Sequence, residues 1–270
     1  MNAELLLMFV LGCDRAYLFA HPERELTEDE QTRYLTASAE RARGVPAQYI
    51  TGHQEFWGMD LIVTPAVLIP RPETEHLVET VIQLLKPHPT LETSAQNDQI
   101  PNSQVRIVDV GTGSGCIALA LAKELPHAEI HATEISPAAL EIARANAARD
   151  LLEKRIHFHS TDLLAGLEPS FDIVVSNPPY VGESEEDQVQ FEVRKFEPRS
   201  AVFGGPAGTE IIERLAPQAW HVLRPGGWLV LEISGTIVNP VLNLLRSWRE
   251  VHVINDLQSI PRVVRARKPC

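Results

Sequence analysis

The spacing of apolar residues predicts helices at the start of the chain and extended structure after them. Residues 5–10 form a short apolar run typical of a buried helical segment. Thr27, followed three residues later by Glu30, forms a capping-box pattern, which predicts a helix running to about Arg43. Aromatic and β-branched residues become frequent over residues 49–63, with glycines between them, and this pattern predicts a hairpin.

Short apolar runs alternate with helical patterns in the second half of the chain. We expect strands at residues 105–110, 129–134, 156–159, 171–176 and 228–232, and a closing antiparallel pair at 251–255 and 263–267. Helices are expected between them, at residues 116–125, 137–149, 209–223 and 240–248. This alternation predicts an α/β fold, in which a largely parallel sheet is covered on both faces and binds ligands at the carboxyl ends of its strands.

A proline-rich segment without apolar periodicity, residues 87–104, separates these two patterns. It holds three prolines and few apolar residues, which indicates a linker. We therefore divide the chain into a helical domain (1–48), a connecting hairpin and helix (49–86) whose helix opens at Pro72, the linker (87–104) and a sheet domain (105–270).

The charge balance argues against a protein whose main task is to coat nucleic acid. The chain has 24 basic and 36 acidic side chains and a formal net charge of −12. Coating a phosphate backbone requires clustered Lys and Arg, so we expect no direct contact with nucleic acid. The longest apolar run, residues 5–13, is too short to span a bilayer, and we expect no membrane contact.

The cysteines predict neither a disulfide framework nor a zinc site. Cys13, Cys116 and Cys270 are odd in number, widely spaced and without a CxxC pair, which favours a reducing compartment and a cytoplasmic location. The histidines likewise show no metal-ligand spacing. We therefore expect no metal site, and we expect ordinary core or surface histidines at His53, His76 and His131.

A glycine loop follows the first strand of the sheet domain directly. Its residues are Asp109, Gly111, Thr112, Gly113, Ser114 and Gly115. The spacing is GxGxG, whereas a dinucleotide fingerprint is GxGxxG and brings a pyrophosphate onto a helix amino terminus. The carboxylate of Asp109 would repel pyrophosphate but could help to hold an ammonium group. S-adenosylmethionine carries an ammonium and a sulfonium, so it fits this loop better than NAD, and a dehydrogenase is disfavoured.

Two acidic residues after the next strands fit the rest of such a cofactor. Glu134 lies nineteen residues after Gly115, at the end of the second strand, where it could accept hydrogen bonds from a ribose diol. Asp162 follows the third strand and would lie near the exocyclic amine of the adenine; taken alone, it could equally be an ordinary loop aspartate.

The fourth strand ends in the tetrapeptide Asn177-Pro178-Pro179-Tyr180. Consecutive prolines fix φ and donate no hydrogen bonds, so the carbonyls around them are free to accept. Together with the side-chain oxygen of Asn177 they could hold both hydrogens of a planar NH2 group, while Tyr180 packs on its face. Such a site suits an amide or an exocyclic amine, with catalysis by positioning and electrostatics.

These motifs resemble the HemK/PrmC family, the bacterial peptide-chain release factor glutamine methyltransferases. The resemblance is carried by VDVGTGSGCIALALA, ATEISPAALEIARANA and FDIVVSNPPYV. NPPY alone is shared with amino-methyltransferases acting on adenine, but GVPAQYITGHQEFWG (44–58) and LIPRPETE (68–75) are similar to the family's own signature. The RVV ending at 262–264 agrees with it as well.

The resemblance implies a class I (Rossmann-like) S-adenosylmethionine-dependent methyltransferase sheet with a small N-terminal helical domain and a connecting β-hairpin. The implied reaction moves a methyl group from S-adenosyl-L-methionine, leaving S-adenosyl-L-homocysteine, to the glutamine amide nitrogen in the Gly-Gly-Gln motif of class I release factors. The helical domain would dock the release factor, and we expect a monomer. Relatives usually have more sequence before the first helix, and either a missing helix or a start assigned too late would leave part of the docking domain incomplete.

The resemblance also assigns residues to roles. Asn177, Pro178, Pro179 and Tyr180 would be catalytic. Arg71 and Glu73 would line the seam between the domains near the substrate. The cofactor would be bound by Asp109, Gly111, Thr112, Gly113, Ser114, Gly115, Glu134, Asp162, Leu163 and Asn177. Leu163 stands where some relatives place an aromatic ring against the adenine.

Two alternative functions remain open at this point. An adenine amino-methyltransferase acting on DNA or RNA would need a basic region around NPPY, yet residues 182–197 hold six acidic side chains and only two basic ones. That acidic stretch is either a solvated loop or a lid that meets a basic protein partner. A non-catalytic S-adenosylmethionine-binding protein is disfavoured by the intact glycine loop and NPPY.

Overall fold

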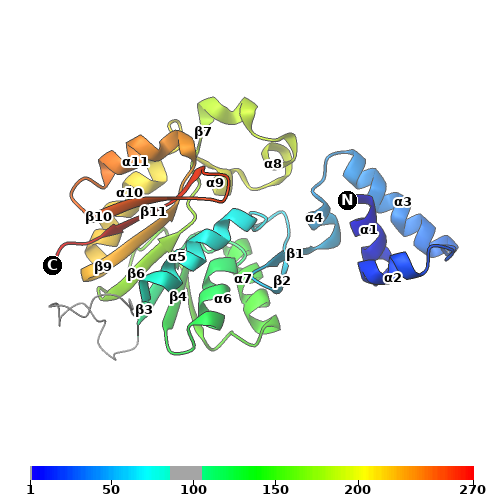
Figure 1. Ribbon diagram of the computed structural model, residues 1–270, viewed down its shortest axis with the longest axis horizontal. Helices are drawn as coiled ribbons and strands as arrows, with labels where there is room; N and C mark the ends of the chain where they lie inside the picture. The colour runs from blue at the N-terminus through cyan, green and yellow to red at the C-terminus, as the bar shows by residue number, and fades with distance from the viewer. Residues whose placement is uncertain (1, 86–104) are drawn as a thin grey trace.

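The computed structural model describes residues 2–85 and 105–270 (Figure 1). The predicted linker at 87–104 lies outside the described residues. The helical region and the C-terminus lie at opposite ends of the long axis of the molecule (Figure 1). None of the helices within the described residues is long and apolar enough to cross a membrane.

Four helices form the N-terminal helical region. They are α1 (Asn2–Leu11), α2 (Arg15–Ala20), α3 (Glu28–Ala42) and α4 (Ala47–Thr51). The predicted capping box is confirmed, because the Thr27 side chain accepts from the Glu30 amide and the Glu30 carboxylate accepts from the Thr27 amide. The helix expected at residues 5–10 is confirmed as part of α1, but its burial is partial: Leu6 and Val10 are buried, whereas Phe9 is 43% exposed because α1 buries one face only.

The predicted hairpin begins four residues later than expected. Residues 49–51 belong to α4, which ends at Gly52 with a left-handed φ of 78° that glycine adopts without strain. The antiparallel hairpin then consists of β1 (His53–Phe56) and β2 (Met59–Ile62). The helix predicted from Pro72 is confirmed as a 3-10 turn, η1 (Pro72–Thr74), followed by α5 (Glu75–Leu85).

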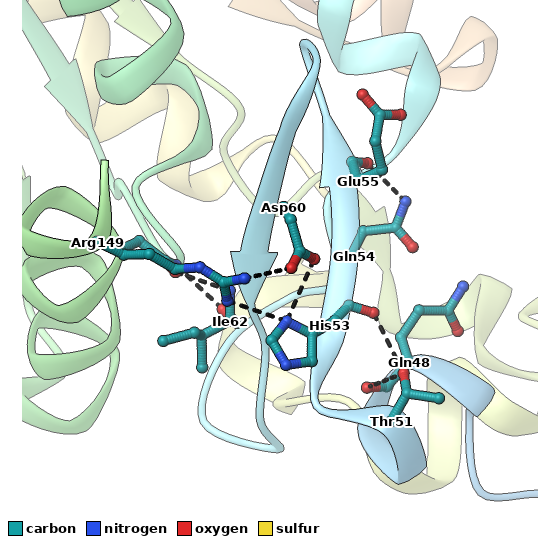
Figure 2. Close-up of polar contacts among 9 residues, drawn as sticks. Gln48, Thr51, His53, Gln54, Glu55, Asp60, Ile62 and Arg149 are labelled. Carbon is teal, nitrogen blue, oxygen red and sulfur yellow. Dashed lines mark hydrogen bonds and ion pairs between the residues drawn. The ribbon is translucent and has the colours of Figure 1, made fainter. Parts of the chain in front are cut away.

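The hairpin is attached to the sheet domain by polar contacts from α7 (Pro137–Arg149). Figure 2 shows Arg149 reaching to the Asp60 carboxylate and the His53 ring on the hairpin. His53 Nδ1 also lies 3.2 Å from Asp60 Oδ1, across the two strands of the hairpin. The hairpin therefore belongs structurally to the sheet domain and not to the helical region.

A seven-stranded sheet, in the order β10-β11-β9-β6-β3-β4-β5, forms the centre of the second domain. Its strands are β3 (Arg106–Val110), β4 (Glu129–Glu134), β5 (Ile156–Ser160), β6 (Phe171–Ser176), β9 (Leu223–Glu232), β10 (Arg249–Asn255) and β11 (Pro261–Arg267). Only β11 runs against its neighbours among these strands, and it forms the predicted closing pair with β10. The expected α/β class with a largely parallel sheet is confirmed.

Helices cover both faces of the sheet, and each face has its own apolar core. One core joins α5 and α6 (Cys116–Glu124) to the strands through residues such as Val81, Leu119 and Ile107. The other lies under α10 (Glu210–Val222) and α11 (Val238–Leu244) and includes Leu215 and Val174. Alternate residues of each strand thus face opposite cores, as a sheet buried on both faces requires.

Several short elements after NPPY were not predicted. They are β7 (Val181–Gly182), η2 (Glu183–Gln188), α8 (Phe191–Phe196), α9 (Arg199–Val202), β8 (Phe203–Gly205) and η3 (Gly235–Ile237). Each is too short to show an apolar period in the sequence. In addition, β9 begins at Leu223 instead of residue 228. The added residues include Gly226, whose φ is +78°, and the pairing of β9 with β6 is irregular there.

Candidate active site

The carboxyl ends of three adjacent parallel strands bring the glycine loop, Glu134 and NPPY together. In the sheet β3 lies between β4 and β6, so the loops that follow these strands meet at one edge. The Ser176 hydroxyl donates to the Val110 carbonyl at 2.7 Å and ties the ends of β6 and β3 to each other. The glycine loop and NPPY therefore start side by side.

The glycine loop is braced by the end of β4. The amides of Gly111 and Thr112 both donate to the Thr133 carbonyl at 2.9 Å. The Glu134 carboxylate accepts from the Gly113 amide at 3.0 Å and, through its other oxygen, from the Ser136 amide at 2.9 Å. Glu134, for which the sequence predicts a ribose contact, thus also fixes the loop.

Gly111 leaves the space above the loop free. Its φ is +70°, and a Cβ added there would meet no atom within 4 Å. Gly115, by contrast, has a φ of +87°, and an added Cβ would come within 3.3 Å of Leu119 and Ala143. One glycine keeps an approach open from outside, and the other lets α6 pack closely against α7.

Asp109 is completely buried beneath the loop. Its Oδ2 atom accepts from the Thr112 hydroxyl at 2.6 Å and from the Ala118 amide at 3.2 Å, at the start of α6. Within the described residues its Oδ1 atom has no hydrogen-bond partner. Burial raises the pKa of this carboxyl to about 7, against the two hydrogen bonds that lower it. An added cation would therefore find an unpaired acceptor here.

Asn146 on α7 joins the glycine loop to the hairpin. It is fully buried, and its side-chain amide donates to the Ser114 carbonyl at 2.9 Å and to the Ile62 carbonyl at 3.0 Å. Its oxygen accepts from the Ile62 amide at 2.7 Å. Sequence reasoning missed this residue; an asparagine among the alanines of a buried helix face was the available signal.

The predicted adenine residues lie at the end of β5. Asp162 forms an ion pair with Arg214, and both side chains are about half exposed. Leu163 has a left-handed φ of 52°, and its side chain packs against the core under α10. Asp162 is therefore engaged by an arginine of the chain itself, while Leu163 turns toward the core.

The NPPY tetrapeptide is held by side chains from distant parts of the sequence. The Asn177 amide nitrogen donates to the hydroxyl of Thr74, a buried residue of η1, at 3.1 Å. The Tyr180 hydroxyl donates to Glu232 at the end of β9, at 3.1 Å. Glu232 is 1% exposed, and burial raises the pKa of its carboxyl. Thr74 and Glu232 are supporting residues that sequence reasoning missed.

The backbone of NPPY also packs against a glycine-rich segment. A Cβ at Gly204 would come within 2.4 Å of the Pro179 carbonyl oxygen, and one at Gly208 within 2.5 Å of the Tyr180 carbonyl oxygen. Only glycine permits this close approach of two main chains. The FGGPAG run at 203–208 was the sequence signal for it.

Arg71 and Glu73 lie beside this network. Arg71 forms an ion pair with Glu197, whose buried carboxylate also accepts from the Ile69 amide at 3.1 Å. The charge of Glu73 is close enough to raise the pKa of Glu232. Arg71 thus joins the segment before η1 to the segment after NPPY. This contact places Arg71 and Glu73 near the predicted substrate site.

The acidic stretch at 182–197 is largely neutralised by the chain's own arginines. Four of its six carboxylates form ion pairs: Glu186 with Arg199, Asp187 with Arg194, Glu192 with Arg41, and Glu197 with Arg71. The alternative of a charged lid aimed at a basic partner is therefore not supported. Two of these pairs instead join the stretch to parts of the chain that precede residue 75.

The sheet topology and the site define a methyltransferase fold. It is similar to the hMettl16 catalytic domain in complex with a MAT2A 3'UTR hairpin, with a TM-score of 0.59 and 17% identity over 89% of this chain and 82% of that chain. It is also similar to a methyltransferase from Pyrococcus furiosus, with a TM-score of 0.55 and 18% identity over 90% of this chain and all of that one.

Sequence comparison resolves the family. Residues 1–52 match the PrmC N-terminal domain, and residues 93–194 match the methyltransferase small domain. A release factor glutamine methyltransferase of Koribacter versatilis is 56% identical over all of this chain and 91% of its own length. Another, from Rhodopirellula baltica, is 37% identical over 99% of this chain and 89% of its own. The chain belongs to the family of release factor glutamine methyltransferases.

Proposed function

We propose that this protein transfers a methyl group from S-adenosyl-L-methionine to the side-chain amide nitrogen of glutamine in the Gly-Gly-Gln motif of class I release factors. The observation that carries the proposal is the orientation of Asn177. Because its amide nitrogen already donates to Thr74, its Oδ1 atom is the one that can receive a substrate NH2 group. An acceptor fixed in this way suits an amide donor.

The cofactor fits the loop on two observations. The unpaired Oδ1 atom of the buried Asp109 can accept from the ammonium group, and the free space over Gly111 lets the methionine part approach the backbone. Glu134 has carboxylate lone pairs left for a ribose diol after its two backbone contacts. When bound, S-adenosyl-L-methionine supplies an electrophilic methyl group on its sulfonium.

The chain's own residues then act by positioning. Asn177 Oδ1 and the carbonyls of the two prolines would hold the hydrogens of the glutamine amide, so that its nitrogen lone pair faces the methyl group. As the new N–C bond forms and the S–CH3 bond breaks to release S-adenosyl-L-homocysteine, positive charge would develop on that nitrogen. The same acceptors would stabilise this charge until one amide hydrogen leaves as a proton to solvent. Tyr180, anchored by Glu232, would close one side of the amide.

Labelled methyl transfer tests this proposal. The protein is incubated with methyl-labelled S-adenosyl-L-methionine and either a class I release factor or duplex DNA, and the modified residue is mapped. We expect label on the Gly-Gly-Gln glutamine and none on DNA. Asn177→Ala should reduce kcat by about 100- to 1,000-fold, the usual cost of removing one preorganised polar contact in the transition state.

The controls separate the alternatives. Asn243→Ala, which removes an exposed asparagine on α11, should leave transfer unchanged. Asn177→Ala should still bind S-adenosyl-L-methionine in calorimetry, since the other nine residues predicted to bind the cofactor are intact. Label on adenine would favour the nucleic-acid enzyme, and cofactor binding without any transfer would favour the non-catalytic protein.

A further inference from the structure

Four metal-ligating side chains gather on one face of the two outer strands, away from NPPY. Glu129 and His131 are two residues apart on β4 and therefore point to the same face. The parallel register pairs His131 with His157 of the edge strand β5. One ligand atom from each of these three residues lies within 4.8 Å of the others. His159, the next residue but one on β5, contacts His131 from the same face.

We propose that Glu129, His131 and His157 bind a divalent transition-metal cation of the zinc type. Two imidazoles and one carboxylate are a donor set that Zn²⁺ accepts. His131 is buried and Glu129 partly buried, whereas His157 is exposed, so the site is rooted in the sheet and open on one side. A solvent molecule would complete a tetrahedral shell from that side.

The surroundings orient the central ligand. His131 Nε2 lies 2.7 Å from a Glu129 oxygen, and its Nδ1 lies 2.9 Å from His159 Nε2. A metal ion taken up between Glu129 and His131 would bind the Nε2 lone pair, so that the single proton of the neutral His131 ring lies on Nδ1 and is donated to His159 Nε2. Such a partner on the far nitrogen is the common arrangement for a metal-binding histidine. The His131 ring also packs edge-on against Phe171, at 5.0 Å between centroids, which limits its rotation.

One neighbouring cation opposes binding. Arg106 Nε lies 3.3 Å from the same Glu129 oxygen, and the guanidinium also contacts Ser170 and the Phe171 ring. Its positive charge competes for the carboxylate and repels an incoming ion. We therefore expect modest affinity, which removal of this arginine should increase.

The site is separate from the candidate active site. Glu129 starts β4 and Glu134 ends it, so the two ends are about 17 Å apart along the strand. Metal bound at Glu129 therefore need not obstruct the cofactor. It would join the edge strand β5 to β4 and resist the opening of that edge. Spacing along the sequence could not reveal the site, because its ligands come from two strands.

Thermal unfolding of the untagged protein with Zn²⁺ tests the proposal. The work uses a Cys270→Ser background, because Cys270 is an exposed thiol that could bind zinc by itself. With a Kd of about 10 μM, 100 μM Zn²⁺ should raise the unfolding midpoint by about 3 °C, and Mg²⁺ at the same concentration should not. Calorimetry should give one site per chain.

Matched variants locate the binding. His157→Ala changes an exposed side chain and should weaken Zn²⁺ binding about 100-fold, whereas His127→Ala, an exposed histidine just before β4, should have no effect. Arg106→Gln should tighten binding. An equal Zn²⁺ response in His157→Ala and in the parent, or no response in the parent, would overturn the proposal.

Discussion

The glycine loop and NPPY begin on neighbouring strands but draw their support from different parts of the chain. The glycine loop is held by Asp109, Thr133 and Glu134, all within about 25 residues of it in sequence. NPPY is held by Thr74, which precedes it by 103 residues, and by Glu232, which follows Tyr180 by 52. One loop is shaped by its own βαβ unit, and the other by the connecting region and the far end of the sheet.

The two loops lie at the same edge of the sheet, but we propose different functions for them. The loop proposed to hold the cofactor depends on contacts with β3, β4, α6 and α7. The loop proposed to orient the acceptor amide requires η1 to lie against β6 and β9. Variants of the first loop should therefore change cofactor affinity, and variants around the second should change kcat while leaving that affinity intact.

The largest effect is expected from Gly111→Val. A side chain here would occupy the free space over the loop and would strain a backbone at φ +70°, so affinity for S-adenosyl-L-methionine should fall at least about 100-fold. Calorimetry measures it. Gly52→Val is the matched control, since Gly52 has a φ of +78° and equally open space but lies in α4's cap. The control should lose similar stability and keep its affinity; a parallel loss of affinity would contradict the prediction.

The next effect concerns Asp109 and pH. Because the apo carboxyl has a pKa raised to about 7, binding of an ammonium group must ionise it at lower pH. Affinity for S-adenosyl-L-methionine should therefore rise about tenfold between pH 5.5 and 7, and this rise should disappear in Asp109→Asn.

The stability of the protein without cofactor tests the raised pKa of Asp109 independently. Since its folded pKa is above the unfolded one, its contribution to stability is present below about pH 4 and is lost as the pH rises through 7. Relative to Asp109→Asn, the parent should become less stable over that pH window in urea unfolding.

The affinity prediction has its own contradicting outcome. If the parent and Asp109→Asn show the same pH profile for cofactor affinity, Asp109 does not hold the ammonium.

A smaller effect should follow from Thr74→Val. Without the hydroxyl, the Asn177 amide is free to turn, and kcat should fall about fivefold, the worth of one hydrogen bond. Cofactor affinity should stay constant, and Thr74→Ser should restore kcat by restoring the hydroxyl. Steady-state kinetics with a release factor measures the change, and a shift in cofactor affinity would mean that the two loops are not separate.

The smallest effect is expected from Arg214→Ala. The pair that Arg214 forms with Asp162 is about half exposed and contributes little to stability. Its removal frees Asp162 to accept from the adenine amine, so affinity for S-adenosyl-L-methionine should rise by at most about threefold. A tenfold loss in calorimetry would show that Arg214 itself supports the cofactor.

The same contrast explains what the sequence could predict. The positions of Gly111 and Glu134 at the ends of β3 and β4 were predictable because they depend on neighbours in one strand-loop-helix unit. Asn177 was recognisable from its tetrapeptide. Thr74 and Glu232 were not, because a threonine in a turn and a glutamate at a strand end become supports only when segments far apart in sequence meet. Residues 49–51 were predicted as extended from their aromatic and β-branched content. Over three residues that content is a weak signal, and Pro46 and Gly52 instead set the ends of the helix α4.

Asn146 has a mechanical consequence. Its three hydrogen bonds place a single buried amide between the second strand of the hairpin and the carbonyl of Ser114 in the glycine loop. Sliding the hairpin over α7 would leave buried polar atoms without hydrogen-bond partners, each at a cost of about 1–3 kcal/mol. We therefore expect a displacement of the hairpin to carry the glycine loop with it.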